Sequence, residues 1–237
     1  LRVRLTIAMP AYNEQDCVEA AAREALAVLD QVDGGGELLV VDDGSTDGTA
    51  AILDRLAAAD RRVRVVRHER NRGISGFNRA MMDEARGDWV LFTSSDGEFD
   101  PREALRFMAL AERAGADAVL GYRQEKNYDP WRQAVSFSFN ALTFVCFGTR
   151  FIDIGSTRLL RRAAFAGIPL HTHSAFLNAE RLLAGRRRGA RILQVPTVHR
   201  PRLAGVGGGA RPRKVAQAIR DLALTRLRWF RFDHYYG

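Results

Sequence analysis

The sequence predicts an α/β protein in which a mostly parallel, Rossmann-like sheet is flanked by helices. Over the first 120 residues, short apolar runs alternate with amphipathic stretches of helical length, which is the pattern of βαβ units. The chain of 237 residues is 46% hydrophobic and 27% charged, so it can bury a large core and is neither a coiled coil nor a disordered chain. Cys17 and Cys146 are far apart, which favours a reduced compartment over a disulfide scaffold.

The first half is expected to alternate regularly between strands and helices. Asn13 is placed to cap the first helix, and Pro101 begins the fourth at a favourable first-turn position. In chain order the expected elements are strand Val3–Met9, helix Glu14–Leu29, strand Glu37–Val41, helix Thr46–Ala58, strand Val63–Arg67, helix Ile74–Ala85, strand Trp89–Thr93, helix Pro101–Ala114 and strand Ala116–Gly121.

The second half is less regular. No stretch reaches the roughly 20 apolar residues of a bilayer span, and residues 1–10 lack the features of a signal peptide. We therefore expect a cytoplasmic protein, either free or bound peripherally to the inner face of the cell membrane. The expected elements are helix Trp131–Gly148, strand Ser156–Leu160, helix Phe176–Ala184, strand Ile192–Val195, a glycine-rich loop Leu203–Ala210 and a basic helix Lys214–Phe232.

The charge is divided unevenly along the chain. Residues 1–120 carry a net charge of −7 and residues 121–237 a net charge of +15, and all but Lys126 and Lys214 of the 36 basic residues are arginine. Codon use in a GC-rich genome explains the arginine excess as simply as function does. The functional alternative is that some guanidinium groups bind phosphate oxygens, which they do better than ammonium groups.

Three polar segments follow strands of the first half, and the carboxyl ends of parallel strands are where ligands bind in such sheets. Pro10–Glu14 follows the first strand, Asp42–Ser45 the second and Ser94–Glu98 the fourth. Asp42 and Asp43 suit hydrogen bonds to ribose hydroxyls or a base edge, although a turn that caps the next helix explains them equally well. Ser45 and Asp47 are the expected caps, which leaves Asp42 and Asp43 freer.

The third segment predicts a metal site. Asp96 and Glu98 are two residues apart, so an extended segment projects both carboxylates to one side. Hard carboxylate oxygens beside a diphosphate suit Mg²⁺ or Mn²⁺. The alternative is a surface turn in front of a helix, with Asp100 as its cap.

Taken in order, these motifs resemble those of family 2 glycosyltransferases of the GT-A fold, in the polyprenyl-phosphate branch of the dolichol-phosphate mannosyltransferase type. The resemblance covers about residues 3–205, and the order of the motifs is more specific than any one of them. The segments that carry it are Pro10–Glu14, Val41–Asp47, Asn71–Gly73 with Asn78, Ala85–Asp88, Gly121–Arg123, Asp129–Arg132, Asp153–Arg158 and Arg202–Gly205.

The resemblance implies a nucleotide diphosphate sugar as donor, a polyprenyl phosphate as acceptor, a divalent cation and inversion at the anomeric carbon. It also implies catalytic roles for Asp96, Arg132 and Arg158. The implied donor-binding residues are Pro10, Ala11, Tyr12, Glu14, Asp42, Asp43, Gly73, Asn78, Ser95 and Asp96, the metal ligands are Asp96 and Glu98, and the acceptor contacts are Arg123, Arg132, Ser136, Arg158 and Arg202.

One position departs from the family pattern. Asp96 matches the last Asp of the family's DxD metal motif, but Ser94 stands where the first Asp is expected. A hydroxyl is a poorer metal ligand than a carboxylate. Glu98 stands where the branch usually has Gln, so it is expected to restore the missing negative charge.

Two helices of the second half are expected to meet lipid. Polar side chains of the helix Trp131–Gly148 recur on one stripe of an otherwise apolar surface (Arg132, Ser136, Asn140 and Thr143), which suits an anionic headgroup beside a lipid tail, or an ordinary buried helix. Residues 211–231 carry seven Lys or Arg and one acid, Asp221, as helices on anionic membranes do. Packing on the domain is the alternative. No nucleic-acid partner is expected, because no recognised binding motif accompanies the charge.

We therefore expect a GT-A domain over residues 1–210, with a donor and metal half (1–120) and an acceptor half (121–210), followed by a basic amphipathic helix (211–237). The predicted function is transfer of a sugar from a nucleotide diphosphate sugar to a polyprenyl phosphate. One alternative is a soluble family 2 enzyme that acts on a hydroxyl of a non-lipid acceptor with Glu180 or Asp153 as general base. Another is a catalytically silent protein that binds a nucleotide sugar or a lipid.

Overall fold

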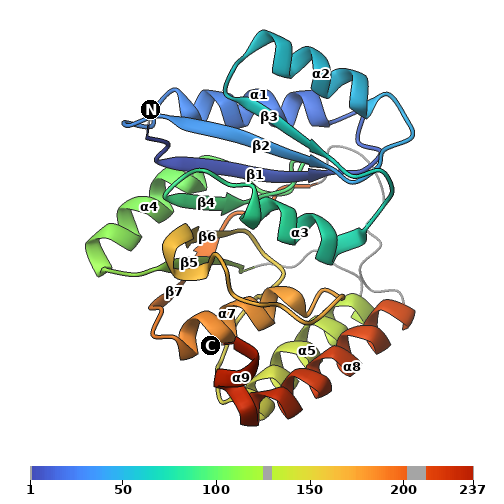
Figure 1. Ribbon diagram of the computed structural model, residues 1–237, viewed down its shortest axis with the longest axis vertical. Coiled ribbons are helices and arrows are strands. Elements are labelled where there is room, and N and C mark those ends of the chain that lie inside the picture. The colour runs from blue at the N-terminus through green and yellow to red at the C-terminus, as the bar shows by residue number, and fades with distance from the viewer. Residues whose placement is uncertain (1, 125–129, 202–211, 237) are drawn as a thin grey trace.

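The computed structural model describes residues 2–124, 130–201 and 212–236, without the side chains of Pro130 and Arg132 (Figure 1). A central sheet has the strand order β3-β2-β1-β4-β6-β5-β7. Only β6 runs antiparallel to its neighbours within the described residues, so the predicted mostly parallel α/β sheet is confirmed. The strands are β1 (Leu5–Ala11), β2 (Gly36–Asp42), β3 (Val63–Arg67), β4 (Trp89–Phe92), β5 (Ala118–Arg123), β6 (Arg158–Arg161) and β7 (Ile192–Thr197).

Helices cover both faces of this sheet. One core lies between the sheet and α1, α2 and α4, and a second core lies between the other face and α3, α6, α7 and the C-terminal helices. Figure 1 shows α5 and α8 side by side, away from the sheet. The helices are α1 (Val18–Leu29), α2 (Thr49–Ala59), α3 (Gly73–Asp83), α4 (Glu103–Ala114), α5 (Pro130–Phe147), α6 (Arg162–Phe165), α7 (Leu177–Arg187), α8 (Pro212–Arg228), the 3₁₀ turn η1 (Trp229–Arg231) and α9 (Phe232–Tyr236).

The first helix begins later than its sequence predicts. Asn13 has a φ of 55° and its side chain makes no cap for α1, which begins only at Val18. Its Oδ1 instead accepts a hydrogen bond from the backbone N–H of Thr46 (2.8 Å). The predicted cap at Asn13 is therefore wrong, because a contact between two loops, distant in sequence, takes up the side chain.

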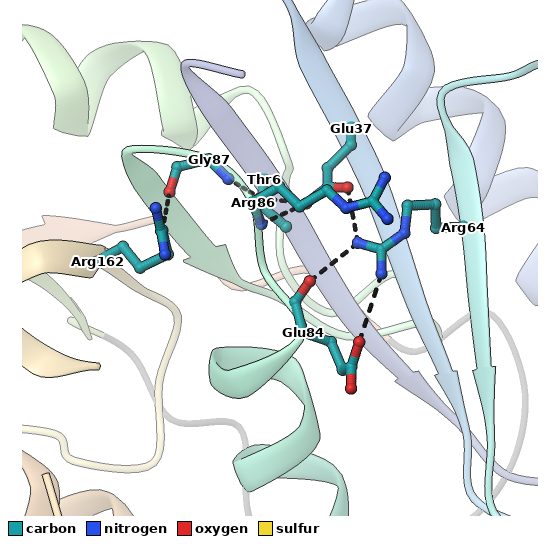
Figure 2. Close-up of polar contacts among 7 residues, drawn as sticks. All are labelled: Thr6, Glu37, Arg64, Glu84, Arg86, Gly87 and Arg162. Carbon is teal, nitrogen blue, oxygen red and sulfur yellow. Dashed lines mark hydrogen bonds and ion pairs between the residues drawn. The ribbon is translucent and has the colours of Figure 1, made fainter. Parts of the chain in front are cut away.

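The amino edge of the sheet, where β1, β2 and β4 begin, is held by a buried polar cluster (Figure 2). The Glu37 carboxylate accepts hydrogen bonds from the Thr6 hydroxyl (2.7 Å), the Arg86 backbone N–H (2.7 Å) and Arg64 Nη1 (2.9 Å). Thr6 Oγ1 in turn accepts a bond from the Gly87 N–H. A Cβ on Gly87 would lie 2.5 Å from the Thr6 nitrogen, so this close approach requires glycine.

The C-terminal helices pack on the domain rather than apart from it. Leu222, Phe232 and Tyr236 belong to the second core, and the Asp221 carboxylate accepts hydrogen bonds from two backbone N–H groups of the loop before α7. The predicted helix Lys214–Phe232 is divided into α8, η1 and α9. Among the described residues, the longest helices fall short of the length and apolarity needed to span a bilayer.

Candidate active site at the carboxyl edge of the sheet

The ends of β1 and β2 meet through paired loops at the carboxyl edge. Ala11 lies beside Asp42 in the register. The Asn13 N–H donates to Ser45 Oγ (3.1 Å), and the Glu14 N–H donates to Thr49 Oγ1 (2.9 Å). Ser45 therefore does not cap α2 as expected. Asp47 accepts from the Thr49 N–H (2.9 Å), but it stands one residue before the N-terminal boundary residue of that helix.

The two adjacent aspartates are buried, and their carboxylates accept hydrogen bonds from other groups of the protein. Asp43 Oδ1 lies 2.6 Å from His68 Nδ1 and accepts a bond from the Arg72 N–H, while its Oδ2 accepts from the Gly73 N–H (2.8 Å). Asp42 Oδ1 accepts from the Ser45 N–H (3.0 Å). The expectation that these two carboxylates are freer than their neighbours is wrong. Asp43 fixes the start of α3, and its predicted contact with a donor remains a prediction.

Acidic groups from two segments converge next to Cys17. The thiol donates to Glu14 Oε2 (2.9 Å). Burial, the bond to Glu14 and the negative charges of Glu14, Asp96 and Asp16 raise the pKa of Cys17 to about 12. The influence of Asp96 on this thiol means that the segment after β4 lies close to the segment after β1. Tyr12 is exposed beside them, Pro10 is half-buried and Ala11 is buried.

The segment after β4 is a tight turn and not the predicted extended stretch. Asp96 Oδ1 accepts a hydrogen bond from the Glu98 N–H (3.0 Å), and Gly97 has a φ of 77°. Glu98 Oε1 lies 3.8 Å from His199 Nε2, beside the end of β7. The turn therefore directs the two carboxylates by a local hydrogen bond, which the spacing of two residues does not reveal.

Hydroxyl groups at this edge are buried without hydrogen-bond partners. Thr93 Oγ1, Ser94 Oγ and Ser156 Oγ have none within the described part of the chain, and Ser95 is also buried. Buried polar atoms are almost always bonded. Their gathering here, beside Asp96, is the feature expected of a place where a polar ligand binds.

The oxygen atoms of this turn fit a divalent cation only if a bound diphosphate supplies the remaining oxygen ligands. In the described ranges no group of three or more His, Cys, Asp or Glu side chains is arranged to hold a metal. Asp96 and Ser94 supply hard oxygen atoms, of which Asp96 Oδ1 already accepts one bond. This set fits an ion that takes most of its oxygen ligands from a diphosphate, and it does not fit an ion held by protein alone.

Two of the predicted acceptor residues, Arg123 at the end of β5 and Arg158 at the start of the antiparallel β6, lie at the same edge. Arg123 is buried and binds Asp153 in a fork, with Nε to Oδ2 at 2.7 Å and Nη2 to Oδ1 at 2.9 Å. Ser136 lies half-buried on α5. The Arg132 side chain and the whole of Arg202 lie outside the described residues, so their roles remain predictions.

Arg158 begins β6 opposite Phe92 at the end of β4. Its Nη2 donates to Asn78 Oδ1 (2.5 Å) on α3 and to Asn178 Oδ1 (2.8 Å) on α7. Burial, reinforced by the charge of nearby Arg181, lowers the pKa of Arg158 to about 9. Arg158 and Asn78, predicted as acceptor and donor contacts, are therefore joined to each other beneath the strand ends, and Arg158 is a buried cation held by neutral amide oxygens.

Neither proposed general base is available for that role in this geometry. Glu180 is completely buried and its carboxylate accepts bonds from the His171 N–H, the Thr172 N–H and hydroxyl, and the Tyr236 hydroxyl. Asp153 is paired with Arg123. The sequence does not reveal this, because a glutamate in a helix has the same pattern whether it faces solvent or a buried loop.

Helix α5 differs from an ordinary surface helix in that some of its polar side chains face the protein while many of its apolar side chains face solvent. Thr143 of the predicted polar stripe is buried and donates to the Phe139 carbonyl, while Asn140 Nδ2 donates to the Ile152 carbonyl (3.0 Å). The opposite face is exposed and mainly apolar: Phe137 and Val145 are 75% and 79% exposed, and Trp131, Leu142 and Phe144 also face solvent. We call these five side chains the outer face of α5. Asn140 and Thr143 of the stripe therefore face the protein, and the apolar face points outward.

Sequence reasoning missed several residues of the edge. His68, which pairs with Asp43, follows the third strand directly, and this position was the available signal. Thr93 and Ser156 also flank strand ends. Arg181, which lies away from this edge, was missed as well: its neighbours Leu182 and Leu183 are buried, and an arginine within such a run was a sign of a buried cation.

Comparisons with known proteins show the family to which the chain is similar. The family model "Glycosyl transferase family 2" matches residues 6–168. The undecaprenyl-phosphate 4-deoxy-4-formamido-L-arabinose transferase of Sodalis glossinidius (strain morsitans) is 30% identical over 207 residues, which are 85% of this chain and 61% of that protein. Its namesake from Edwardsiella ictaluri (strain 93-146) is 28% identical with the same coverage. This chain thus spans less than two thirds of the length of these relatives.

Solved structures share the fold at low identity. Glucosyl-3-phosphoglycerate synthase from Mycobacterium tuberculosis, in complex with Mn²⁺, UDP-glucose and phosphoglyceric acid, has a TM-score of 0.71 at 20% identity, over 94% of this chain and 79% of that one. A mannosyltransferase from Pyrobaculum calidifontis, in complex with GDP-mannose and Mn²⁺, has a TM-score of 0.67 at 20% identity, over 96% and 65%. Together with the family match over most of the sheet, these likenesses establish that the chain belongs to glycosyl transferase family 2 and has the GT-A fold.

Proposed function

We propose that the protein transfers a sugar from a nucleotide diphosphate sugar to a polyprenyl phosphate at the surface of a membrane. The observation that carries this proposal is the outer face of α5, an exposed aromatic and aliphatic surface on a helix whose polar stripe faces the protein. A soluble acceptor has no need of such a surface. The relatives that are named as undecaprenyl-phosphate transferases support the same acceptor class.

The donor would bind at the carboxyl edge. Its nucleoside would lie over Pro10, Ala11 and Tyr12, and its diphosphate near Asp96 and the unpartnered hydroxyls of Ser94 and Ser156. Asp96 and Glu98, the ligands that the sequence predicts, would hold Mg²⁺ or Mn²⁺ together with the diphosphate oxygens, and the Ser94 hydroxyl belongs to the same segment. When bound, the cation supplies charge compensation for the leaving diphosphate.

The acceptor needs positioning rather than a base, because a phosphate monoester is already ionised at neutral pH. Arg123, Arg132, Ser136 and Arg202 are the proposed contacts of its phosphate. Attack on the anomeric carbon from the side opposite the diphosphate gives inversion. Catalysis then rests on alignment and on preorganised charge, which agrees with the occupied state of Glu180 and Asp153.

The membrane contact would combine the outer face of α5 with the basic side of α8. Arg213, Lys214 and Arg220 are exposed on α8, and α8 lies beside α5 (Figure 1). Apolar insertion and attraction to anionic lipids act together in interfacial helices. This arrangement would keep the protein peripheral on the inner face of the cell membrane.

A transfer assay tests the proposal. The purified chain is incubated with UDP-, GDP- and other nucleotide sugars and Mg²⁺ or Mn²⁺, with and without a short polyprenyl phosphate, and both the released nucleotide diphosphate and the glycosylated lipid are measured. We expect product only with the lipid phosphate, and none with the corresponding polyprenol. Transfer to polyprenol or to a water-soluble alcohol with equal efficiency would contradict the acceptor assignment.

A further inference from the structure

A cavity lies away from the carboxyl edge, between α3, α7 and the loop that follows α6. Its volume is about 290 Å³, at the small end of the range for small-molecule sites, about 300–1,000 Å³. Met82, Phe165 and Ile168 form apolar walls, while Arg79, Asp83 and Arg181 supply charge. No residue assigned to the donor or acceptor lines it.

Arg181 contributes a buried cation to this cavity. The residue is only 3% exposed, and its Nη2 donates to the Asn78 carbonyl (3.1 Å). Its Nη1 is buried and has no hydrogen-bond partner in the described part of the chain. A guanidinium that is both desolvated and incompletely bonded is costly unless a ligand completes it.

The surrounding charges leave an excess of one cation. Arg79 and Arg158 both repel Arg181: burial lowers the pKa of Arg181 to about 10, with Arg79 adding to the decrease, and Arg181 in turn lowers the pKa of Arg158. Asp83 and Glu180 act in the opposite direction on Arg181. Of the residues that line the cavity, Arg79 and Arg181 are cationic and Asp83 is anionic, so one negative charge balances the lining.

We propose that this cavity binds a small organic monoanion, a carboxylate attached to an apolar body. The carboxylate would accept hydrogen bonds from Arg181 Nη1 and from Arg79, which lies at the cavity with its Nη2 on the Thr172 carbonyl (2.8 Å). The apolar body would lie against Met82, Phe165 and Ile168. A dianion such as a phosphate monoester is disfavoured for two reasons. It carries one negative charge more than the cavity needs for neutrality, and it offers no apolar group to contact the apolar walls.

A ligand bound in the cavity would also restrain the position of Arg158 at the carboxyl edge. Arg181 holds the backbone of Asn78, and the side chain of Asn78 holds Arg158 at the start of β6. A ligand that fixes Arg181 would therefore fix this chain of contacts. The cavity does not depend on the proposed transfer reaction, and ligand binding to the cavity can be measured in the absence of the sugar donor and acceptor.

Isothermal titration with benzoate, its neutral analogue benzamide and inorganic phosphate tests the proposal on the full chain. We expect benzoate to bind saturably and to raise the unfolding temperature, while benzamide and phosphate bind at least about tenfold more weakly. Arg181→Met, which keeps the length and removes the charge, should abolish benzoate binding. Arg79→Gln should weaken it by about tenfold, and it keeps the test decisive if the first variant does not fold.

Arg186→Gln is the matched control, because Arg186 is exposed on the same helix, and it should bind benzoate like the unaltered chain. Equal binding of benzoate and benzamide would overturn the proposal. So would phosphate binding without benzoate binding, absence of any binding, or unchanged benzoate affinity in Arg79→Gln.

Discussion

The buried Glu37 carboxylate at the amino edge and two buried hydroxyls at the carboxyl edge differ in how far they are hydrogen-bonded. At the amino edge, the Glu37 carboxylate is fully engaged by Thr6, Arg64 and Arg86 (Figure 2). At the carboxyl edge, the hydroxyls of Ser94 and Ser156 lack partners within the described residues. The sheet is the same, so the difference is not one of fold. Polar groups that satisfy one another hold the chain together, and polar groups left unsatisfied indicate where something else binds.

A cavity at the amino edge extends the contrast. It has a volume of about 710 Å³ and is lined by Arg4 and Arg161 among others. Arg4 lies 2.6 Å from Glu112 and Arg161 lies 3.1 Å from Asp117. Both charges are paired with carboxylates, although Arg161 Nε makes no hydrogen bond within the described residues. The size of the cavity alone therefore does not identify a ligand site.

The largest effect is expected from Asp96→Asn. The amide keeps an oxygen for the Glu98 N–H but loses the negative charge, so transfer should fall by about 10³-fold or more while the unfolding temperature stays nearly constant. Turnover with saturating donor and polyprenyl phosphate measures it, with thermal unfolding as the control. Substantial activity in this variant would break the assignment of the carboxyl edge as the donor site.

Glu37→Ala should produce the reverse result. It leaves Arg64, Thr6 and the Arg86 N–H without their acceptor, so the free energy of unfolding should fall by about 3 kcal/mol, while activity per folded molecule is retained. Denaturant unfolding measures the change. Glu19→Gln, at an exposed pair with Arg23, is the matched control and should leave the free energy of unfolding nearly unchanged. A catalytic defect in folded Glu37→Ala would remove the distinction between the edges.

The outer face of α5 is the proposed contact with lipid, and α5 is the next described element after β5. Changing Phe137 and Val145 together to Ser should weaken binding to phosphatidylglycerol vesicles by about tenfold or more. Vesicle co-sedimentation measures this, and Ile74→Ser, at an exposed position on α3, is the control. Equal binding by the double variant would assign the membrane contact, if any, to another surface.

The smallest effect concerns Cys17. Its raised pKa, about 12, compared with about 8.5 in an unfolded chain, means that the folded state holds the thiol proton more tightly. The stabilisation is complete below about pH 8.5 and is lost as the pH rises toward about 12. The difference in stability between the unaltered chain and Cys17→Ala should therefore shrink between pH 8 and pH 10. A pH-independent difference would place the acidic groups farther from the thiol.

Much of the fold was predictable because strand burial and helical periodicity are local. The expected strand Val63–Arg67 matches β3 as observed, and the others differ by a few residues at their ends. The short helix α6 was missed, because four residues carry no periodic signal. Asn13 failed as a cap because Thr46, remote in sequence, competes for its side chain.

The sequence predicts which segments meet at the site, but it does not predict which side chains bond to one another there. Parallel strands bring Pro10–Glu14, Asp42–Ser45 and Ser94–Glu98 to one edge, and the sequence order alone implies this. Which carboxylates the protein itself occupies depends on distant donors, such as His68 for Asp43 and Tyr236 for Glu180. The direction of the α5 stripe was equally hidden, since periodicity defines two faces without saying which one points inward.

Helix α7 is buried from Leu177 to Gly185. Its Asn178 reaches Arg158 at the start of β6, and its Glu180 reaches Tyr236 at the end of α9. A rod enclosed in this way moves only as a whole. A displacement of the terminal helices would therefore reach Arg158 beneath the strand ends as a rigid-body shift, without any bending of the sheet.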